Sequence, residues 1–450
     1  MAAINLHTLY KHRPCPAYKN SGIDWLGKIP VHWITLKLKR IANISYGIGT
    51  ELDRTISTGI PIISLPNVLI DGNLNLQEVA FSGIIEENIE KSLILQNGDL
   101  LFNWRNGSSE HVGKTAVFYS NDKYTHVSFL LRIRFDYTLY SSNYFHQFIN
   151  NLRYTGFFKS VKAGVNNTFN QSELRELYVI CPPLPEQNAI AAFLDHETAR
   201  LDALIEKKQR LIDLLREKRA ALITRAVTKG LNPAAPMKDS GIEWLGEIPE
   251  GWEVKKVKYI ALVNNKELPE LTYQDFEFQY IDISSVDNIG NYISNTLTFK
   301  EAPSRARRCV KIGDTILSTV RTYLKAISFI TNNADTIIVS TGFAVFQPIY
   351  LFPKYLFRLA QSEYFIQKVV ALSNGVSYPA ITPFELKNIK IPIPPYLEQR
   401  AIAEYLDYET AKIDNLVGKI QASIEKLQEY RAALISAAVT GKIDVREMVE

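Results

Sequence analysis

Polar side chains that can recognise nucleic-acid bases gather in one glycine-containing segment in the first half of the chain. Arg105 and Asn106 precede Gly107, and Ser108 and Lys114 follow it. In the major groove of double-stranded DNA, arginine favours the guanine edge and asparagine favours the adenine edge. We therefore take Arg105, Asn106, Ser108 and Lys114 as candidates for DNA binding.

The second half of the chain holds its own basic candidates. Arg305, Arg307 and Arg308 form a cluster, and Arg321 and Tyr323 follow a predicted β-strand. Guanidinium groups can bind phosphates as well as guanine edges. We therefore add these five residues to the candidates for DNA binding.

Two short segments, GVNNT and GVSYP, occupy equivalent places ahead of two predicted long helices. Their glycines and small polar side chains would let backbone N–H groups approach phosphates. From these segments Asn166, Asn167, Ser377 and Tyr378 join the candidates for DNA binding.

The sequence shows no recognisable catalytic or metal site. NGSSEHVGKT resembles a phosphate-binding loop, but Ser108 stands where the first glycine is needed, and the segment leads into a predicted strand. The seven histidines lack metal-ligand spacing, and the three cysteines are far apart. Neither an Asn-Pro-Pro-Tyr-type methyltransferase motif nor a nuclease carboxylate–lysine set is evident. We expect this chain to have no catalytic residue, metal ligand or bound cofactor.

An internal repeat supplies the elements that would position these candidates. YKNSGIDWLGKIPVHW near the N-terminus recurs as MKDSGIEWLGEIPEGW, and PEQNAIAAFLDHETARLD recurs as LEQRAIAEYLDYETAKID. The segments between the repeated motifs differ much more, although a duplication that simply drifted is the alternative explanation. We interpret the repeated parts as a scaffold and the divergent parts as surfaces that contact different targets.

Four tryptophans recur within the first repeated motif. They are Trp25 and Trp33 in the first copy and Trp244 and Trp252 in the second. Large aromatic side chains in a repeated scaffold favour core positions over base stacking. We expect all four to be core anchors.

Each repeat ends in a predicted long helix. Prolines precede the first helix, and Gly230 and Gly441 close the first and second helices. Each helix would hold about 44 residues and measure roughly 65 Å. Apolar residues recur at spacings of three, four or seven, which is typical of a helix that buries one stripe against another helix. The expected pairing residues are Leu194, Leu201, Leu204, Leu211, Leu215 and Leu222 in the first helix and Leu406, Ile413, Leu416, Ile420, Leu427 and Leu434 in the second.

We expect the two helices to pair with each other in antiparallel fashion, since each apolar stripe needs a partner. The alternative is that each helix packs separately on its own domain.

The repeated motifs resemble those of a known protein family. YKNSGIDWLGKIP–HW, KDSGIEWLGEIP–GW, CPPLPEQNAIAAFLD and PIPPYLEQRAIAEYLD are similar to parts of the specificity (S) subunits of type I restriction–modification enzymes. The resemblance covers essentially the whole chain. It implies two target-recognition domains that each read one half of a bipartite, asymmetric DNA site, while the helices fix the unspecified gap between the halves. Recognition residues differ among family members, so the resemblance assigns no individual base contact.

The expected fold class is α+β, with two mixed α/β target-recognition domains, two long antiparallel coiled-coil helices that separate them, and a pseudo-two-fold internal repeat. The expected boundaries are 1–181 for the first recognition domain, 182–231 for the first helix, 232–393 for the second recognition domain and 394–450 for the second helix.

The resemblance also implies partners and cofactors. In such complexes the helices dock two methyltransferase (M) subunits, which bind S-adenosylmethionine and methylate adenine in double-stranded DNA. Motor–nuclease (R) subunits can join and cleave unmodified DNA after ATP-driven translocation. S-adenosylmethionine, ATP and Mg²⁺ are therefore expected on the partner subunits.

Two other functions stay open at the level of the sequence. One is a single-chain DNA methyltransferase or nuclease, which the missing cofactor motifs disfavour. The other is a coiled-coil adaptor without DNA contact. The net charge of +4 and the isoelectric point near 8.6 are compatible with a nucleic-acid partner without requiring one. The chain lacks both an apolar signal core and a continuous apolar span, so we expect a cytoplasmic protein without membrane contact.

Overall fold

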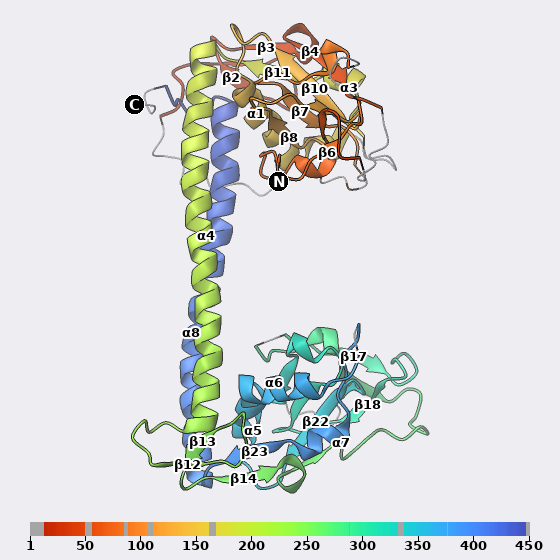
Figure 1. Ribbon diagram of the computed structural model, residues 1–450, viewed down its shortest axis with the longest axis vertical. Helices are drawn as coiled ribbons and strands as arrows, with labels where there is room; N and C mark the ends of the chain where they lie inside the picture. The colour runs from red at the N-terminus through yellow and green to blue at the C-terminus, as the bar shows by residue number, and fades with distance from the viewer. Residues whose placement is uncertain are drawn as a thin grey trace. The chain divides into compact units, whose positions relative to one another are not determined.

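The computed structural model describes residues 13–49, 56–84, 89–106, 108, 111–161, 168–287, 289–331, 337–375 and 377–446. The chain divides into two compact units. The first comprises Met1–Lys207 and Ala422–Glu450, and the second comprises Lys208–Gln421. Both units combine helices with β-sheets, so the predicted mixed α/β character is confirmed (Figure 1).

The first unit is built around an antiparallel four-stranded sheet with the order β4-β10-β7-β8. A three-stranded sheet, β6-β5-β9, and the pairs β1-β2 and β11-β3 complete its strands. The strands are β1 (Tyr18–Asn20), β2 (Lys28–Pro30), β3 (Ile34–Lys37), β4 (Ala42–Tyr46), β5 (Pro61–Ile63), β6 (Ala80–Phe81), β7 (Leu100–Asn103), β8 (Thr115–Val117), β9 (Thr125–His126), β10 (Leu130–Phe135) and β11 (Tyr178–Cys181). Its shorter helices are α1 (Ser142–Tyr154), α2 (Phe157–Val161) and α3 (Gln171–Glu176).

The second unit contains an antiparallel four-stranded sheet with the order β15-β22-β19-β20 and a second four-stranded sheet, β17-β16-β21-β18. The pairs β12-β13 and β14-β23 lie outside these sheets. The strands are β12 (Met237–Asp239), β13 (Glu247–Pro249), β14 (Glu253–Lys256), β15 (Ala261–Val263), β16 (Glu277–Ile281), β17 (Asn295–Thr298), β18 (Ala306–Cys309), β19 (Thr315–Ser318), β20 (Ile327–Phe329), β21 (Ile337–Ser340), β22 (Phe343–Pro348) and β23 (Lys390–Ile393). Its shorter helices are α5 (Pro353–Ala360), α6 (Glu363–Leu372) and α7 (Pro383–Asn388).

Two long helices contribute residues to both units, and they pack together as the sequence predicts. Helix α4 (Leu184–Lys229) has 46 residues and helix α8 (Tyr396–Val439) has 44. In the first unit Arg431 of α8 pairs with Asp202 of α4, with Nε 2.9 Å from Oδ1. In the second unit Arg219 of α4 pairs with Asp414 of α8 at the same distance. The early part of each helix therefore faces the late part of the other.

The buried stripe of these helices corrects the predicted set of pairing residues. Leu204, Leu211 and Leu416 are 41%, 44% and 45% exposed, whereas Ile212 is fully buried. The other nine predicted residues are buried or half-buried, as follows: Leu194, Leu201, Leu215, Leu222, Leu406, Ile413, Ile420, Leu427 and Leu434.

The error has a physical cause in the coiled-coil repeat. A coiled-coil seam advances by alternating steps of four and three residues. In α4 these steps pass through the polar residues Thr198 and Lys208, and both are more buried than Leu204 or Leu211. Following leucines alone therefore selects Leu204 and Leu211, each one residue before the more buried Ile205 and Ile212.

The expectation of four tryptophan anchors is right for two and wrong for two. Trp33 and Trp252 are 2% and 1% exposed, but Trp25 and Trp244 are 42% and 51% exposed. Each buried indole donates a hydrogen bond to a glutamate in the first turn of a long helix. Trp33 donates to Glu186 at 2.8 Å, and Trp252 donates to Glu398 at 3.0 Å. The buried tryptophans thus fix the start of each long helix to the entry segment of its own unit.

No helix among the described residues combines the length and the apolar character needed to cross a membrane.

Candidate nucleic-acid interface

In the second unit, the segment after β19 pairs with the GVSYP segment that precedes α7. The N–H of Arg321 donates to the carbonyl of Pro379 at 2.8 Å, and the N–H of Ile381 donates to the carbonyl of Thr319 at 3.0 Å. These bonds join two segments that are far apart in the sequence. They bring together Arg321 and Tyr378, two of the predicted DNA-binding residues.

The side chain of Arg321 lies over an exposed aromatic ring. Its guanidinium carbon is 4.5 Å from the ring centroid of Tyr378, which is 62% exposed. Within the described part of the chain, this guanidinium makes no side-chain hydrogen bond or ion pair. Stacking holds a guanidinium in a fixed plane while its N–H groups at the edge stay available to another partner.

The backbone of this loop is held in an uncommon conformation. Arg321 has φ 50° and Lys325 has φ 55°, both in the left-handed region that non-glycine residues rarely adopt. The short 3₁₀ turn Thr322–Leu324 lies between them. The hydroxyls of Thr322 and Ser373 lie 2.9 Å apart, and Lys325 forms an ion pair with Glu363. Such strain persists only where the surroundings hold the chain, and it is often found at functional loops.

The other DNA-binding candidates in these two paired segments are also exposed. Tyr323 is 52% exposed, Leu324 is 49% exposed, and Ser377 is exposed beside Tyr378. The loop therefore presents one stacked cation, a phenol, a hydroxyl and an apolar side chain on its surface. This combination suits contact with base edges, a thymine methyl group and phosphates.

The three arginines of the basic cluster in the second unit have different surroundings. Arg305 is exposed but forms an ion pair with Asp282, with Nη2 2.8 Å from Oδ2. Arg307 lies over the ring of Phe299, 4.7 Å from the centroid. Arg308 is mostly buried, and it donates to the carbonyl of Phe343. Burial lowers the pKa of Arg308, although the nearby Glu267 opposes this effect.

In the first unit, the segment after β7 makes the corresponding pairing. Arg105 forms an antiparallel bridge with Thr168, and the N–H of Phe169 donates to the carbonyl of Trp104 at 2.7 Å. The exposed Arg105 lies 6.0 Å from the ring centroid of Phe129, which is 44% exposed. Each unit thus has an exposed arginine near an aromatic ring just after the matching strands β7 and β19. The bridges Arg105–Thr168 and Val320–Ala380 place Arg105 level with Val320, one residue before Arg321.

The other candidates of the first unit have different surroundings. The side-chain oxygen of Asn106 accepts a hydrogen bond from the N–H of Ser108 at 3.2 Å, and Ser108 is exposed. Lys114 is 8% exposed, and its amine donates to the carbonyl of Val68 at 2.7 Å. Burial lowers the pKa of Lys114. The predicted contacts Asn166 and Asn167 lie outside the described residues.

Sequence reasoning missed the aromatic ring beneath Arg105. Phe129 lies between β9 and β10, in a segment whose composition is typical of core-forming β-strands. An exposed phenylalanine beside an arginine is visible only after the two segments are brought together in space. No group of three or more histidine, cysteine, aspartate or glutamate residues within the described ranges is placed to hold a metal ion.

A family model provides the first comparison with known proteins. The model for the type I restriction modification DNA specificity domain matches residues 30–214 and again residues 249–426. The two matched segments together cover most of the chain and correspond to its two repeats.

Relatives and solved structures extend this likeness. The MjaX specificity subunit, named for a type I restriction enzyme of Methanocaldococcus jannaschii, is 26% identical over 428 residues, covering 94% of this chain and 96% of that protein. The MjaVIII specificity subunit of the same organism is 28% identical over 277 residues, covering 59% and 62%.

Two solved structures share the fold at 15% identity. A chain from a study of complex assembly and conformational transition in a type I R-M system has a TM-score of 0.70, covering 92% of this chain and 99% of that one. The HsdS subunit from Thermoanaerobacter tengcongensis has a TM-score of 0.54, covering 92% and 98%. The chain therefore belongs to the type I restriction modification DNA specificity domain family, and it is a DNA-sequence specificity subunit.

Proposed function

We propose that each unit of this chain reads one half of a bipartite DNA site. The observation that carries this proposal is the repeated pairing of two loops next to an exposed arginine, with Arg105 near Phe129 in one unit and Arg321 over Tyr378 in the other. The rings differ and the surrounding loops differ, so the two units would select different base sequences. Asn106, Ser108, Tyr323 and Ser377 are proposed to supply neighbouring contacts.

The proposed architecture has recognition domains at 1–181 and 232–393 and helices at 182–231 and 394–450. The common strand order of the sheets β4-β10-β7-β8 and β15-β22-β19-β20 supports a pseudo-two-fold repeat. The opposed ion pairs of α4 and α8 support an antiparallel coiled coil. Such helices would act as a ruler that fixes the gap between the two half-sites.

The ruler makes a measurable prediction. Inserting four helical residues between Leu204 and Leu211 should lengthen α4 by roughly 6 Å, or about two base pairs. We expect the recognised gap to widen while both half-sites keep their sequences, as measured by mapping methylated adenines. A second variant with seven residues inserted in both helices keeps the seam in phase, and it should also widen the gap. A changed half-site in either variant would contradict the ruler.

Arg105 provides a test of base reading in the first unit. Its guanidinium lies farther from its ring than that of Arg321, so the contact is less fixed and we expect a smaller effect. Arg105→Ala should cost about 1 kcal/mol of discrimination at one base position if Arg105 reads guanine. Methylation rates on sites with single-base substitutions would measure this cost. Equal weakening at all sequences would instead assign Arg105 to a phosphate.

We further propose that the chain has no catalytic activity of its own and works in the cytoplasm with two methyltransferase subunits. S-adenosylmethionine would bind to those subunits, and ATP and Mg²⁺ would serve motor–nuclease subunits where these are present. The outer faces of the helices support a docking role, because Leu211, Leu214 and Leu416 are 44%, 55% and 45% exposed. Exposed apolar side chains of this kind are typical of protein interfaces.

The decisive experiment is methylation mapping in a host that expresses this chain with its methyltransferase partner. We expect one asymmetric motif with two defined halves and a fixed gap, which disappears when this chain is left out. Methylation by the isolated chain would support a single-chain enzyme instead. Methylation that is independent of this chain would support an adaptor without DNA contact.

A further inference from the structure

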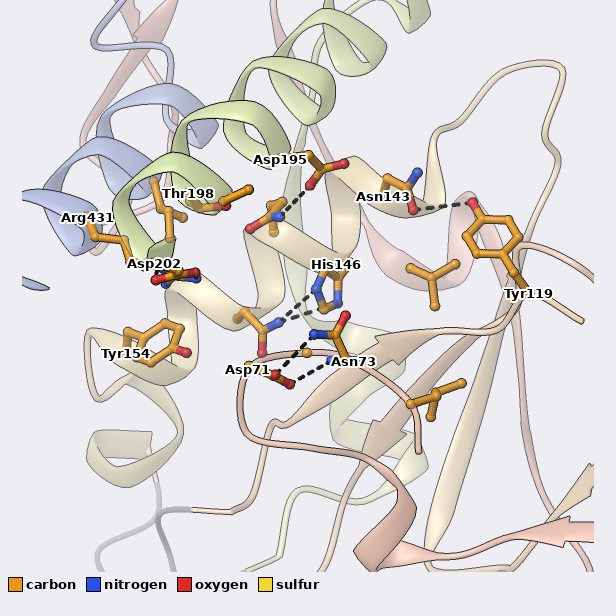
Figure 2. A pocket seen from close by; sticks show the side chains of 17 residues that line it. Asp71, Asn73, Tyr119, Asn143, His146, Tyr154, Asp195, Thr198, Asp202 and Arg431 are labelled. Carbon is orange, nitrogen blue, oxygen red and sulfur yellow. Dashed lines mark hydrogen bonds and ion pairs between the residues drawn. The ribbon is translucent and has the colours of Figure 1, made fainter. Parts of the chain in front are cut away.

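The first unit contains a polar pocket of about 620 Å³ that includes none of the candidate DNA contacts. Figure 2 shows Asp195 and Asp202 projecting into it from α4, Arg431 from α8, and Asp71 from the loop between β5 and β6. Arg431 pairs with Asp202, with Nε 2.9 Å from Oδ1, and Asp71 accepts hydrogen bonds from Asn73. Asp195 has no ion pair with a described residue. His146 also lines the pocket, and burial lowers its pKa to about 4, so it is neutral near pH 7.

The second unit has an equivalent pocket of about 500 Å³. The repeated segments FLDHETARLD and YLDYETAKID place Asp407 where the first unit has Asp195, and Asp414 where it has Asp202. The repeated segments KRAALI and YRAALI likewise place Arg219 where the first unit has Arg431.

Two buried tyrosines fix the correspondence between α1 and α5. Tyr144 donates to the carbonyls of Ile180 and Val439, and Tyr355 donates to the matching carbonyls of Pro392 and Val227. Asn143 and Gln147, which flank Tyr144, therefore stand where Lys354 and Arg358 flank Tyr355.

The second unit neutralises its carboxylate with these two cations. Asp407 lies 2.6 Å from Nζ of Lys354 and 2.8 Å from Nη2 of Arg358. Burial alone would raise the pKa of Asp407, but the hydrogen bonds from Lys354 and Arg358 outweigh it and the pKa is lowered. The carboxylates of the second unit's pocket are therefore neutralised by its own side chains.

The first unit keeps the carboxylate but lacks both cations. Asp195 accepts a hydrogen bond from the amide of Gln147 at 3.1 Å, and burial raises its pKa despite this bond. A second polar residue, Asn150, also lines this pocket. Asn150 is 5% exposed, and its amide oxygen accepts no hydrogen bond from the described residues. Buried polar groups are rarely left unsatisfied, so this oxygen marks a place for a donor.

We propose that the first-unit pocket binds an organic cation whose ammonium or guanidinium group takes the place that Lys354 and Arg358 fill in the second unit. The cation could belong to a free polyamine or to a basic side chain of a partner protein, since both offer the same chemistry. Several N–H donors on one charged group suit two carboxylates and an amide oxygen.

A bound cation is expected to strengthen the attachment between two helices of the first unit. Asn143 and Gln147 belong to α1, whereas Asp195 and Asp202 belong to α4. A cation between these helices would fasten the recognition head of the first unit to its long helix. The second unit achieves the same fastening with its own ion pairs, and so it needs no ligand.

The first test is calorimetric titration of spermidine into the full chain at constant ionic strength. We expect saturable binding that Asp195→Asn weakens at least about tenfold. Asp213→Asn, which removes an exposed carboxylate elsewhere on α4, is the matched control and should leave the affinity unchanged. Absence of binding, equal weakening by both variants, or equal competition by Mg²⁺ would overturn the proposal, because each would leave only unspecific charge screening.

The second test fills the pocket from within. The double variant Asn143→Lys and Gln147→Arg reproduces the cations of the second unit, and it should raise the Tm of the first unit and abolish spermidine binding. Unchanged spermidine binding would overturn the proposal. Repeating the titration on the assembly with the methyltransferase partner separates the two sources. Loss of the spermidine site on assembly identifies a partner side chain, and its persistence identifies a free polyamine.

Discussion

Trp252→Ala should lower the free energy of unfolding of the second unit by about 3–5 kcal/mol. The indole is 1% exposed and belongs to the same core as Ile223 and Val227 at the end of α4. Its removal leaves a large cavity and deprives Glu398 of a hydrogen bond of 3.0 Å. Urea unfolding followed by a probe within the second unit would measure the change as a lower transition midpoint.

Trp244→Ala is the matched control, since it changes the same residue type in the same repeated motif. Trp244 is 51% exposed, and Lys368 lies 3.8 Å above its ring. Loss of an exposed cation–π contact should cost less than about 1 kcal/mol. Equal destabilisation by the two variants would show that Trp252 is not more buried than Trp244 in solution.

The contrast between these tryptophans shows where sequence reasoning reaches its limit. The repeated motif correctly marks a structural unit, because similar segments adopt similar local structure. It cannot separate an anchor from a surface residue, since both tryptophans recur with equal fidelity. Burial depends on what packs against a side chain, and here that is a long helix from a remote part of the chain.

The long helices were the most predictable elements because their signals are local. Prolines, apolar periodicity and closing glycines all act within a few residues of one another. Gly230 and Gly441 adopt φ values of 75° and 71°, as expected of helix-ending glycines. The seam itself was less predictable, because Thr198 and Lys208 occupy positions that a search for leucines passes over.

The sequence predicts some of the residues of the candidate interface, but it does not predict how they are arranged in space. The sequence singled out Arg321 and Tyr378, but the backbone pairing that joins their segments is a long-range contact. The same limit explains why Lys114 and Arg308 are predicted DNA contacts, although the side chain of each donates a hydrogen bond to a backbone carbonyl of this chain. Their acceptors, the carbonyls of Val68 and Phe343, are distant in the sequence.

Arg321→Ala should reduce discrimination at one base position of the second half-site by about 1–3 kcal/mol. The guanidinium is stacked on Tyr378 at 4.5 Å, and the loop that bears it is held in place, so the contact is organised before DNA binds. We expect methylation of the preferred site to fall towards the rate on sites substituted at that single base. Initial rates on a panel of single-base substitutions would measure the effect.

Two matched variants separate reading a base from holding a phosphate. Arg321→Lys keeps the charge but loses the planar fork, so it should restore little discrimination if Arg321 reads guanine. Arg321→Gly removes the guanidinium and also suits the φ of 50°, so stability should not fall while discrimination does. Another set of results would assign Arg321 to the DNA backbone. In that case Arg321→Ala weakens DNA binding equally on every sequence and makes its salt dependence shallower, and Arg321→Lys restores binding. If Arg321→Gly unfolds at the same urea concentration as the unchanged chain, its loss of discrimination cannot be attributed to unfolding and must come from the missing contact.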